Sequence, residues 1–392
     1  MLPLSDAPNP AGTPVVTYLL IVLNVLVFAL FTLPMRGQAP TPGDPRIDAY
    51  VSVLRESLPP DVPLRDLVRS MTEYDLFVFE HGYKPGAPQL ADLLVAMFLH
   101  GGFMHLFGNM LFLWIYGDNV EHRLGRVRYL FWYLFTGTAA TLFFALLASD
   151  SLVPMVGASG AISGVLGFYF WWFPRNVVRV LLLFFPILVR VVEIPARIVL
   201  GLYLFIDNVL PWLFTAGGGG GVAHGAHIGG FVAGVAAAFV IARRQVAATP
   251  REYQTSAPAV DDPAAAVATA LHRGDMPTAA RAYFALPAAA ARDALDPDQV
   301  MSLAAWLADH GHGEAALAVY QRYLQQHPKS GRVAEAHVGA GMALLHHLDQ
   351  PTTAYQHFTA ALGGQPAAAV AARAHAGLAE IAGLQKSPAR WF

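Results

Sequence analysis

The residues from Met155 to Pro174 read MVGASGAISGVLGFYFWWFP and include no Asp, Glu, Lys or Arg. A helix of this length extends about 30 Å, which is the thickness of the hydrocarbon core of a bilayer. Near its start the stretch contains Gly-Ala-Ser-Gly, and a polar side chain inside a membrane is costly and by default marks function. The stretch therefore predicts a membrane span with a functional serine, Ser159, close to one end.

Five other stretches also have the composition of membrane spans, so we expect residues 1–245 to form a bundle of six transmembrane helices. They are Val15–Pro34, Leu93–Gly117, Tyr129–Ala148, Ile194–Phe214 and Gly221–Ala242. Charged residues and prolines interrupt the sequence just before Ile194. Its uncharged piece Val180–Val189 is too short to cross a bilayer, so we assign that piece to the membrane interface.

Composition supports a membrane class for the chain. Of its 392 residues 55% are hydrophobic and only 13% are charged, whereas soluble domains carry about 25% charged residues. The lipid bilayer is therefore the expected surrounding. The net charge of −2 and the lack of a basic cluster argue against a nucleic-acid partner. The chain has no cysteine, which rules out disulfides and thiolate chemistry.

The short loops predict the orientation of the bundle. Basic residues follow the second, fourth and sixth expected spans, at Arg123, Arg126, Arg128, Arg175, Arg179, Arg243 and Arg244. The turns Ser149–Pro154 and Thr215–Gly220 have none. By the positive-inside rule both termini lie in the cytoplasm, and we expect the protein in a bacterial inner membrane. The fourth and sixth spans then run in the same direction.

The C-terminal part predicts a separate helical domain. After a linker at residues 246–262, residues 263–392 are Ala-rich and amphipathic. Aromatic residues recur at Tyr283, Tyr320 and Phe358, a spacing close to the ~34-residue period of tetratricopeptide helix pairs. An Ala-rich helical bundle without a binding groove is the alternative. In either form the chain is expected to be all-α, and this cytoplasmic domain is expected to dock a protein partner or the cytoplasmic tail of a substrate.

Two polar residues are expected at equal depth in the parallel fourth and sixth spans. Ser159 is the fifth residue of one span and His227 is the seventh residue of the other. A serine hydroxyl is a weak nucleophile until a base accepts its proton, and imidazole has the pKa for that task. The pattern predicts Ser159 as the nucleophile and His227 as the base.

The second span supplies further polar candidates. Asn109 and His105 are four residues apart and so share a helical face. They can offer an amide and an imidazole N–H to a developing oxyanion, beside the backbone N–H of Ser159. Since the three spans with these polar residues contain no Asp or Glu, the sequence predicts a Ser/His dyad.

Small residues at helical spacing predict that the fourth and sixth spans approach closely. Gly160, Gly230 and Gly234 are the main packing candidates, because glycines allow two membrane helices to come into backbone contact. Close approach is what would bring Ser159 to His227.

Over Val15–Arg244 the sequence resembles the rhomboid intramembrane proteases. Three motifs carry the resemblance: His100, His105 and Asn109 in the second span; Gly157, Ser159 and Gly160 in the fourth; and Ala226, His227, Gly230 and Gly234 in the sixth. The resemblance implies a serine endopeptidase that cleaves transmembrane segments of other proteins without a metal or cofactor. It implies that Ser159 and His227 are catalytic, that His105 and Asn109 form the oxyanion hole with Gly157 in support, and that His100 has a structural and hydrogen-bonding role.

The sequence departs from many rhomboids at two places. Ser163 stands where relatives carry an aromatic residue under the catalytic histidine, and Met35–Leu90 lacks the tryptophan of a Trp-Arg pair. The main alternative is a non-catalytic rhomboid-like adaptor that binds transmembrane helices and recruits cytoplasmic partners. A transporter that uses buried histidines as proton carriers is a third hypothesis, but it predicts inverted repeats, which the sequence does not show.

Overall fold

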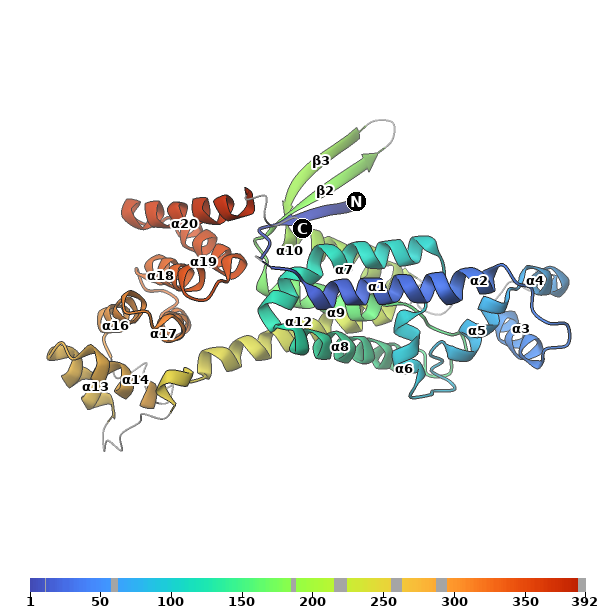
Figure 1. The fold of residues 1–392 in the computed structure, drawn as a ribbon, viewed down its shortest axis with the longest axis horizontal. Coiled ribbons are helices and arrows are strands. Elements are labelled where there is room, and N and C mark those ends of the chain that lie inside the picture. Colours follow the sequence, from blue (N-terminus) through green and yellow to red (C-terminus); the bar gives the residue numbers. More distant parts are fainter. Residues whose placement is uncertain are drawn as a thin grey trace. The chain divides into compact units, whose positions relative to one another are not determined.

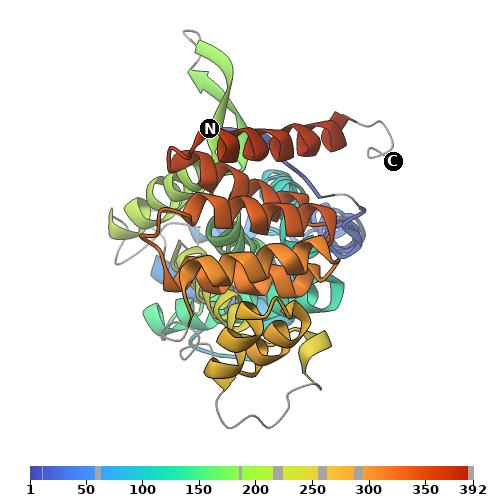
Figure 2. The ribbon, with the colours of Figure 1, turned by 90° about the vertical axis from the view of Figure 1, so that its left-hand side faces the viewer.

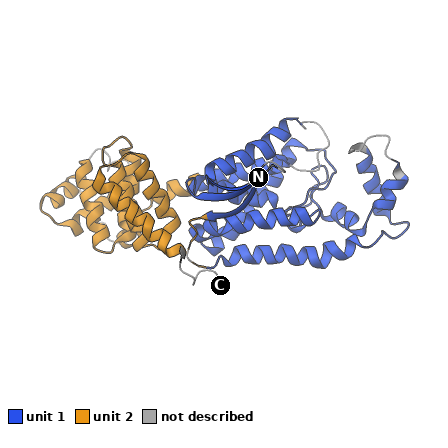
Figure 3. Cartoon of the chain, turned by 90° about the horizontal axis from the view of Figure 1, so that it is seen from above, with its two compact units in different colours: residues 1–6, 13–238 blue, residues 7–12, 239–392 orange. Residues whose placement is uncertain are grey.

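A computed structural model describes the chain except for residues 11, 58–62, 185–187, 215–223, 255–262, 287–294 and 387–392. Figure 1 shows a mostly helical protein. It divides into two compact units, coloured separately in Figure 3. Unit 1 holds residues 1–6 and 13–238, and unit 2 holds residues 7–12 and 239–392. The predicted linker lies partly outside the described residues.

Unit 1 is built around long apolar helices. In chain order its helical elements are α1 (Val15–Val27), η1 (Phe28–Thr32), α2 (Leu33–Arg36), α3 (Pro45–Ser57), α4 (Leu64–Ser70), α5 (Glu73–His81), α6 (Asp92–Val95), η2 (Ala96–Phe98), α7 (Phe103–Leu124), α8 (Arg126–Leu147), α9 (Ser159–Trp172), α10 (Ala196–Leu204), η3 (Phe205–Val209), α11 (Leu210–Phe214) and α12 (His224–Ala247). α12 continues past the boundary between the units. Apolar side chains such as Leu19, Leu23 and Leu146 point outward, as lipid-facing residues do.

Four described helical segments are long and apolar enough to cross a membrane. They are Val15–Arg36, Arg126–Leu147, Ala196–Phe214 and His224–Tyr253. A fifth is present if the bent pair Asp92–Phe98 and Phe103–Leu124 counts as one span. The number of six spans stays a prediction, because the fourth expected span is shorter than a bilayer crossing.

That fourth span is α9, which has 14 residues and not the twenty-residue length of the apolar run. It extends about 21 Å. The helix begins only at Ser159 because Met155 pairs with Tyr83 in an antiparallel bridge and Gly157 has a φ of 129°. Its side chains from Ala161 to Tyr169 are buried. α9 is therefore a central helix enclosed by protein.

The second expected span, Leu93–Gly117, is not one continuous helix. It bends by 95° between η2 and α7, at His100-Gly101-Gly102. Tyr74 Oη donates to the His100 carbonyl at 2.8 Å and accepts from the His100 N–H at 3.1 Å. The Arg36 guanidinium donates to the Gly101 carbonyl. These bonds satisfy backbone groups that the break leaves without helical partners, which a buried chain requires.

The prediction of an all-α chain is wrong in two segments, at residues 2–7 and at residues 177–195. Strands β2 (Val177–Phe184) and β3 (Leu188–Pro195) form an antiparallel hairpin, paired from Val177↔Pro195 to Phe184↔Leu188. β1 (Leu2–Ala7) completes a three-stranded sheet in the order β1-β2-β3. The interfacial assignment of Val180–Val189 missed these strands. Their many Val and Ile residues favour a pleated conformation, and Arg179 lies directly opposite Glu193, a favourable cross-strand pair.

α9 and α12 cross in backbone contact through their glycines. A Cβ added to Gly230 would collide with the Gly160 carbonyl, and one added to Gly234 would collide with the Gly164 carbonyl. Both contacts advance by four residues along each helix, so the two helices run parallel. On its other side Gly160 faces α8, where an added Cβ would lie 2.8 Å from Ala140 Cβ. Glycine is thus required on α9 and α12 for the two helices to meet.

Gly234→Ala is expected to destabilise the fold and to reduce any activity of the site, because the new methyl group meets backbone that cannot rotate away. Overpacking of this kind costs about 1–3 kcal/mol. The matched control is Gly201→Ala on α10, where no described atom lies within 4 Å of an added Cβ and alanine is the better helix former. Thermal unfolding of the two purified variants in detergent checks this. Equal melting temperatures would show that the α9–α12 contact does not need glycine.

Unit 2 consists of helices that pack against one another in chain order, as Figure 2 shows in orange to red for α16 to α20. The helices are α13 (Pro263–His272), α14 (Met276–Ala285), α16 (Pro297–Asp309), α17 (Gly313–Gln326), α18 (Val333–His346), α19 (Pro351–Gly363) and α20 (Ala368–Lys386), preceded by the short turn η4 (Arg251–Tyr253). The recurring aromatics Tyr283, Tyr320 and Phe358 are buried on α14, α17 and α19, the second helix of each pair. Each of these helices follows a left-handed residue, Gly274, Gly311 or Asp349. The three aromatics therefore occupy the same place in three successive helix pairs, and a tetratricopeptide-like domain stays a prediction.

Candidate active site

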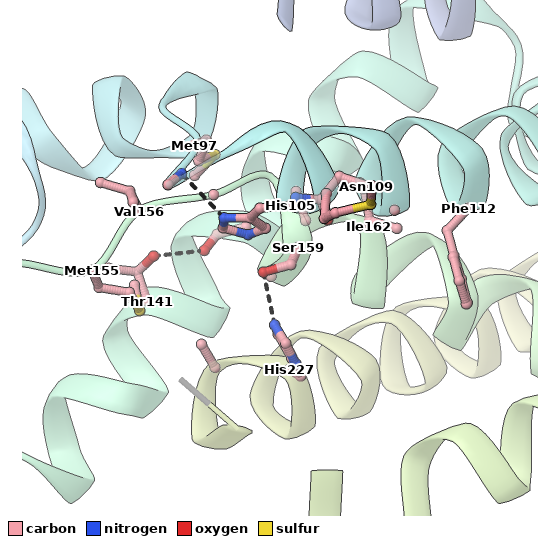
Figure 4. A pocket seen from close by; sticks show the side chains of 18 of the residues that line it. Met97, His105, Asn109, Phe112, Thr141, Met155, Val156, Ser159, Ile162 and His227 are labelled. Carbon is pink, nitrogen blue, oxygen red and sulfur yellow. Dashed lines mark hydrogen bonds between the residues drawn. The ribbon is translucent and has the colours of Figure 1, made fainter. Parts of the chain in front are cut away.

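The described part of unit 1 contains a cavity of about 710 Å³ between α7, α9 and α12. Figure 4 shows it with the polar side chains of these helices turned into it. Its lining includes His105, Asn109, Gly157, Ser159 and His227. The structure therefore brings these five predicted residues to one cavity, and Gly160 also lines it. Much of the remaining lining is apolar, so the polar groups lie in a largely hydrophobic pocket.

Ser159 and His227 are in hydrogen-bond contact. Ser159 Oγ lies 2.7 Å from His227 Nε2, the contact drawn as a dashed line in Figure 4. Ser159 is the first residue of α9 and His227 lies in the first turn of α12. The parallel crossing of these helices places both first turns at the same level. As the first helical residue, Ser159 also has an N–H without an acceptor in its own helix.

The other ring nitrogen of His227 contacts a residue that the sequence reasoning missed. His227 Nδ1 lies 2.6 Å from Asn208 Oδ1, and Asn208 belongs to η3 in the fifth expected span. The prediction of a dyad rests on the lack of Asp and Glu in the three spans that carry the motifs. It leaves out Asn208, an amide in a different span, although a polar side chain in an apolar stretch is a signal of function.

His105 presents one ring nitrogen to the cavity as a donor. The Gly101 N–H donates to His105 Nδ1 at 3.3 Å, so the ring proton of the neutral imidazole resides on Nε2. A Cβ added to Gly157 would lie 2.8 Å from His105 Nε2. Gly157 therefore leaves the space that the His105 ring occupies beside Ser159, and its positive φ also favours glycine.

Asn109 lies one turn after His105 on the same face of α7. Its side chain lines the cavity and is only 8% exposed. Within the described residues its Nδ2 is buried and has no hydrogen-bond acceptor. A buried amide donor without a partner costs roughly 1–3 kcal/mol, so a polar ligand atom that accepts from it would be bound favourably.

His100 does not line the cavity. Its ring is 1% exposed and meets the ring of His105 edge-on, with 5.1 Å between centroids. Its backbone is held by Tyr74, as described above. The geometry gives His100 a place behind His105 that is not in contact with Ser159.

These features define an integral membrane protein in which a half-buried serine and histidine lie side by side in a cavity between helices. Among the described residues no group of three His, Cys, Asp or Glu side chains is arranged to hold a metal ion. The expectation that the protein uses no cofactor stays a prediction.

Comparison with known proteins identifies the membrane part of the chain further. Residues 87–244 match the family model described as Rhomboid domain. The chain is 30% identical over 155 residues to RHOMBOID-like protein 6, mitochondrial, of Arabidopsis thaliana and 35% identical over 155 residues to RHOMBOID-like protein 4 of the same plant. It is 36% identical over 100 residues to Rhomboid protein 1, mitochondrial, of Saccharomyces cerevisiae. These findings support the rhomboid family.

The similarity covers part of each protein. The alignments include 38% of this chain for the two plant relatives and 24% for the yeast relative. The chain spans 43%, 33% and 28% of the lengths of RHOMBOID-like protein 6, RHOMBOID-like protein 4 and the yeast protein. Since the relatives come from a plant and a yeast, the bacterial inner membrane stays a prediction.

Proposed function

We propose that this protein is an intramembrane serine endopeptidase that cleaves transmembrane segments of other membrane proteins. The observation that carries the proposal is the 2.7 Å contact between Ser159 Oγ and His227 Nε2 inside a membrane-embedded cavity. The rhomboid match over residues 87–244 supports the same class. Helix packing alone does not require a hydrogen bond between the Ser159 hydroxyl and the His227 imidazole.

In the proposed reaction His227 acts as the general base and then as the general acid. Nε2 removes the Ser159 hydroxyl proton while Oγ attacks the scissile carbonyl carbon. When the C–N bond breaks, the imidazolium gives that proton to the leaving amine. Water then attacks the acyl ester and gives a proton to Nε2, and this proton returns to Ser159 as the new carboxyl terminus leaves.

The oxyanion of each tetrahedral intermediate requires preorganised donors. The proposed donors are Asn109 Nδ2, which has no acceptor among the described residues, His105 Nε2–H and the Ser159 N–H at the start of α9. All three belong to rigid helices. The N-terminal end of α9 also carries a partial positive charge, which favours an anion at this position.

The proposed substrate is a membrane-spanning helix that unwinds locally near the site. We place the active site toward the external side, with both termini in the cytoplasm, on the basis of the loop charges. The helix pairs of unit 2 then lie in the cytoplasm. There the tetratricopeptide-like repeat would dock a protein partner or the cytoplasmic tail of a substrate.

The test uses the purified chain in liposomes with a fluorophosphonate probe and a single-span substrate. The probe is expected to modify Ser159 and to stop cleavage, since only a serine activated by a base attacks phosphorus rapidly. Ser163, one turn further along α9 and 1% exposed, is the internal control and should stay unmodified in peptide mass spectra. Substrate binding without turnover or labelling would instead favour the non-catalytic adaptor.

A further inference from the structure

The fifth membrane segment changes its helical geometry beside the site. α10 passes into a π-helical turn, η3, at Phe205–Val209, and α11 follows. Pro211 stands two residues after this turn. It has no N–H to offer the Asp207 carbonyl and its ring would collide with that carbonyl in a regular α-helix. The π-turn at Phe28–Thr32 likewise precedes Pro34 by two residues, so the same sequence device occurs twice.

The π-turn determines which side chain of the segment faces the site. Asn208 is 1% exposed, whereas its neighbour Asp207 is exposed. One extra residue in a turn rotates all later positions by about 100° relative to an uninterrupted α-helix. π-Turns inside α-helices are frequent at functional sites for this reason. Here the rotation brings an uncharged amide inward.

The orientation of the Asn208 amide follows from its two contacts. Its Nδ2 donates to the Tyr203 carbonyl at 3.1 Å, and a carbonyl can only accept. Its Oδ1 therefore faces His227 Nδ1 at 2.6 Å. Because an amide oxygen can only accept, Nδ1 must carry the proton. The neutral imidazole then has its lone pair on Nε2, which faces Ser159 Oγ.

This contact supplies an anchor that α9 does not provide. Among the described residues of α9, the hydrogen-bond partner of His227 is Ser159, which contacts only Nε2. The His224 ring also meets the His227 ring edge-on, with 6.4 Å between centroids, but this contact does not determine which nitrogen of His227 carries the proton. A hydrogen bond to Nδ1 fixes both the ring plane and the tautomer, as the orienting member of a serine-hydrolase triad does.

We propose that Asn208 is the positioning residue of His227. The site then works as a Ser159–His227–Asn208 triad, in which Asn208 orients the imidazole and takes no proton. The inference rests on the proposed protease function. Asn208 acts through His227 and does not touch the substrate. As a neutral group it orients the imidazole without placing an ion in the membrane core, where a carboxylate is costly.

The kinetic test compares Asn208→Leu, which has nearly the same volume but no polar atom, with Asn208→Asp, which keeps an acceptor for Nδ1–H. Asn208→Leu is expected to lower kcat about 100-fold and to leave KM within about twofold. Asn208→Asp should recover much of the lost kcat. The matched control is Asp207→Asn, an exposed change in the same π-turn, which should behave as wild type. Equal kcat for wild type and Asn208→Leu would overturn the inference.

A spectroscopic test separates this inference from the proposed function. In protein labelled with ¹⁵N-histidine, the His227 signals are assigned from their loss in His227→Gln. Wild type is expected to show a protonated Nδ1 and an unprotonated Nε2, and Asn208→Leu should lose this single tautomer. An unchanged tautomer in Asn208→Leu overturns the inference even if the protein is an active protease. If wild type binds substrate without cleaving it, the protease proposal fails, while loss of the tautomer in folded Asn208→Leu still shows that Asn208 orients His227.

Discussion

Ser159→Ala is expected to abolish cleavage of a single-span substrate in liposomes, with a loss on the order of 10⁴-fold or greater. The variant removes the nucleophile, and among the described residues the other hydrogen-bond partner of His227 is the amide of Asn208, which cannot replace it. Alanine is a strong helix former and Ser159 is the first residue of α9, so the fold and substrate affinity should be retained. Initial cleavage rates and substrate pull-down, measured on the same liposomes, check both parts of this expectation.

His227→Ala and the double variant decide whether the two residues act as a unit. Each single variant should lose about as much activity as the double variant. Without the imidazole the hydroxyl is a weak nucleophile, and without the hydroxyl the imidazole has no nucleophile to deprotonate. Ser163→Ala is the control, since its side chain is buried away from the cavity lining. If the double variant lost activity by the product of the two single fold-losses, the two residues would act independently and a shared proton transfer would be contradicted.

Asn109→Ala is expected to lower kcat by about 10²–10³-fold with little change in KM. In the resting site Asn109 Nδ2 has no acceptor among the described residues, and we expect its hydrogen bond to become strongest when the oxyanion develops. An interaction made only in the transition state affects kcat and not ground-state binding. Single-turnover rates at saturating substrate, together with KM, measure this.

Thr141→Val provides a matched control for the same cavity. Thr141 also lines it, but its hydroxyl already donates to the Gly137 carbonyl within α8 at 3.1 Å. We therefore expect kcat to stay within about threefold of wild type. A variant of Asn109 that raised KM and left kcat unchanged would assign this residue to substrate binding and remove it from the proposed oxyanion hole.

Much of the membrane unit could be predicted from the sequence because the signals are local. Uncharged stretches of sufficient length predict helices in a bilayer without knowledge of their neighbours. Helical periodicity places His105 and Asn109 on one face of α7, and it places Gly230 and Gly234 on one face of α12. These positions depend only on distances along one helix. His105 and Asn109 both line the cavity, and Gly230 and Gly234 both meet the backbone of α9.

The tertiary structure decided the features that depend on contacts between distant segments. The bend at His100 requires Tyr74, which lies 26 residues away. α9 starts at Ser159 because Met155 before it pairs with Tyr83. Hydropathy along the chain does not predict such a pairing. The β2–β3 hairpin replaces an expected interfacial segment because its strands satisfy each other's backbone groups.

Asn208 shows the difference between the two kinds of information most clearly. The sequence alone determined that a serine and a histidine belong to two glycine-rich helices of similar depth. It did not determine which residue of the fifth segment faces that histidine, because a proline-linked π-turn changes the helical phase just before the site. Packing between segments places the amide of Asn208 against Nδ1 of His227, 19 residues further along the chain. The sequence of one helix determines which residues share a face of it, but the tertiary structure determines which other segment packs against that face.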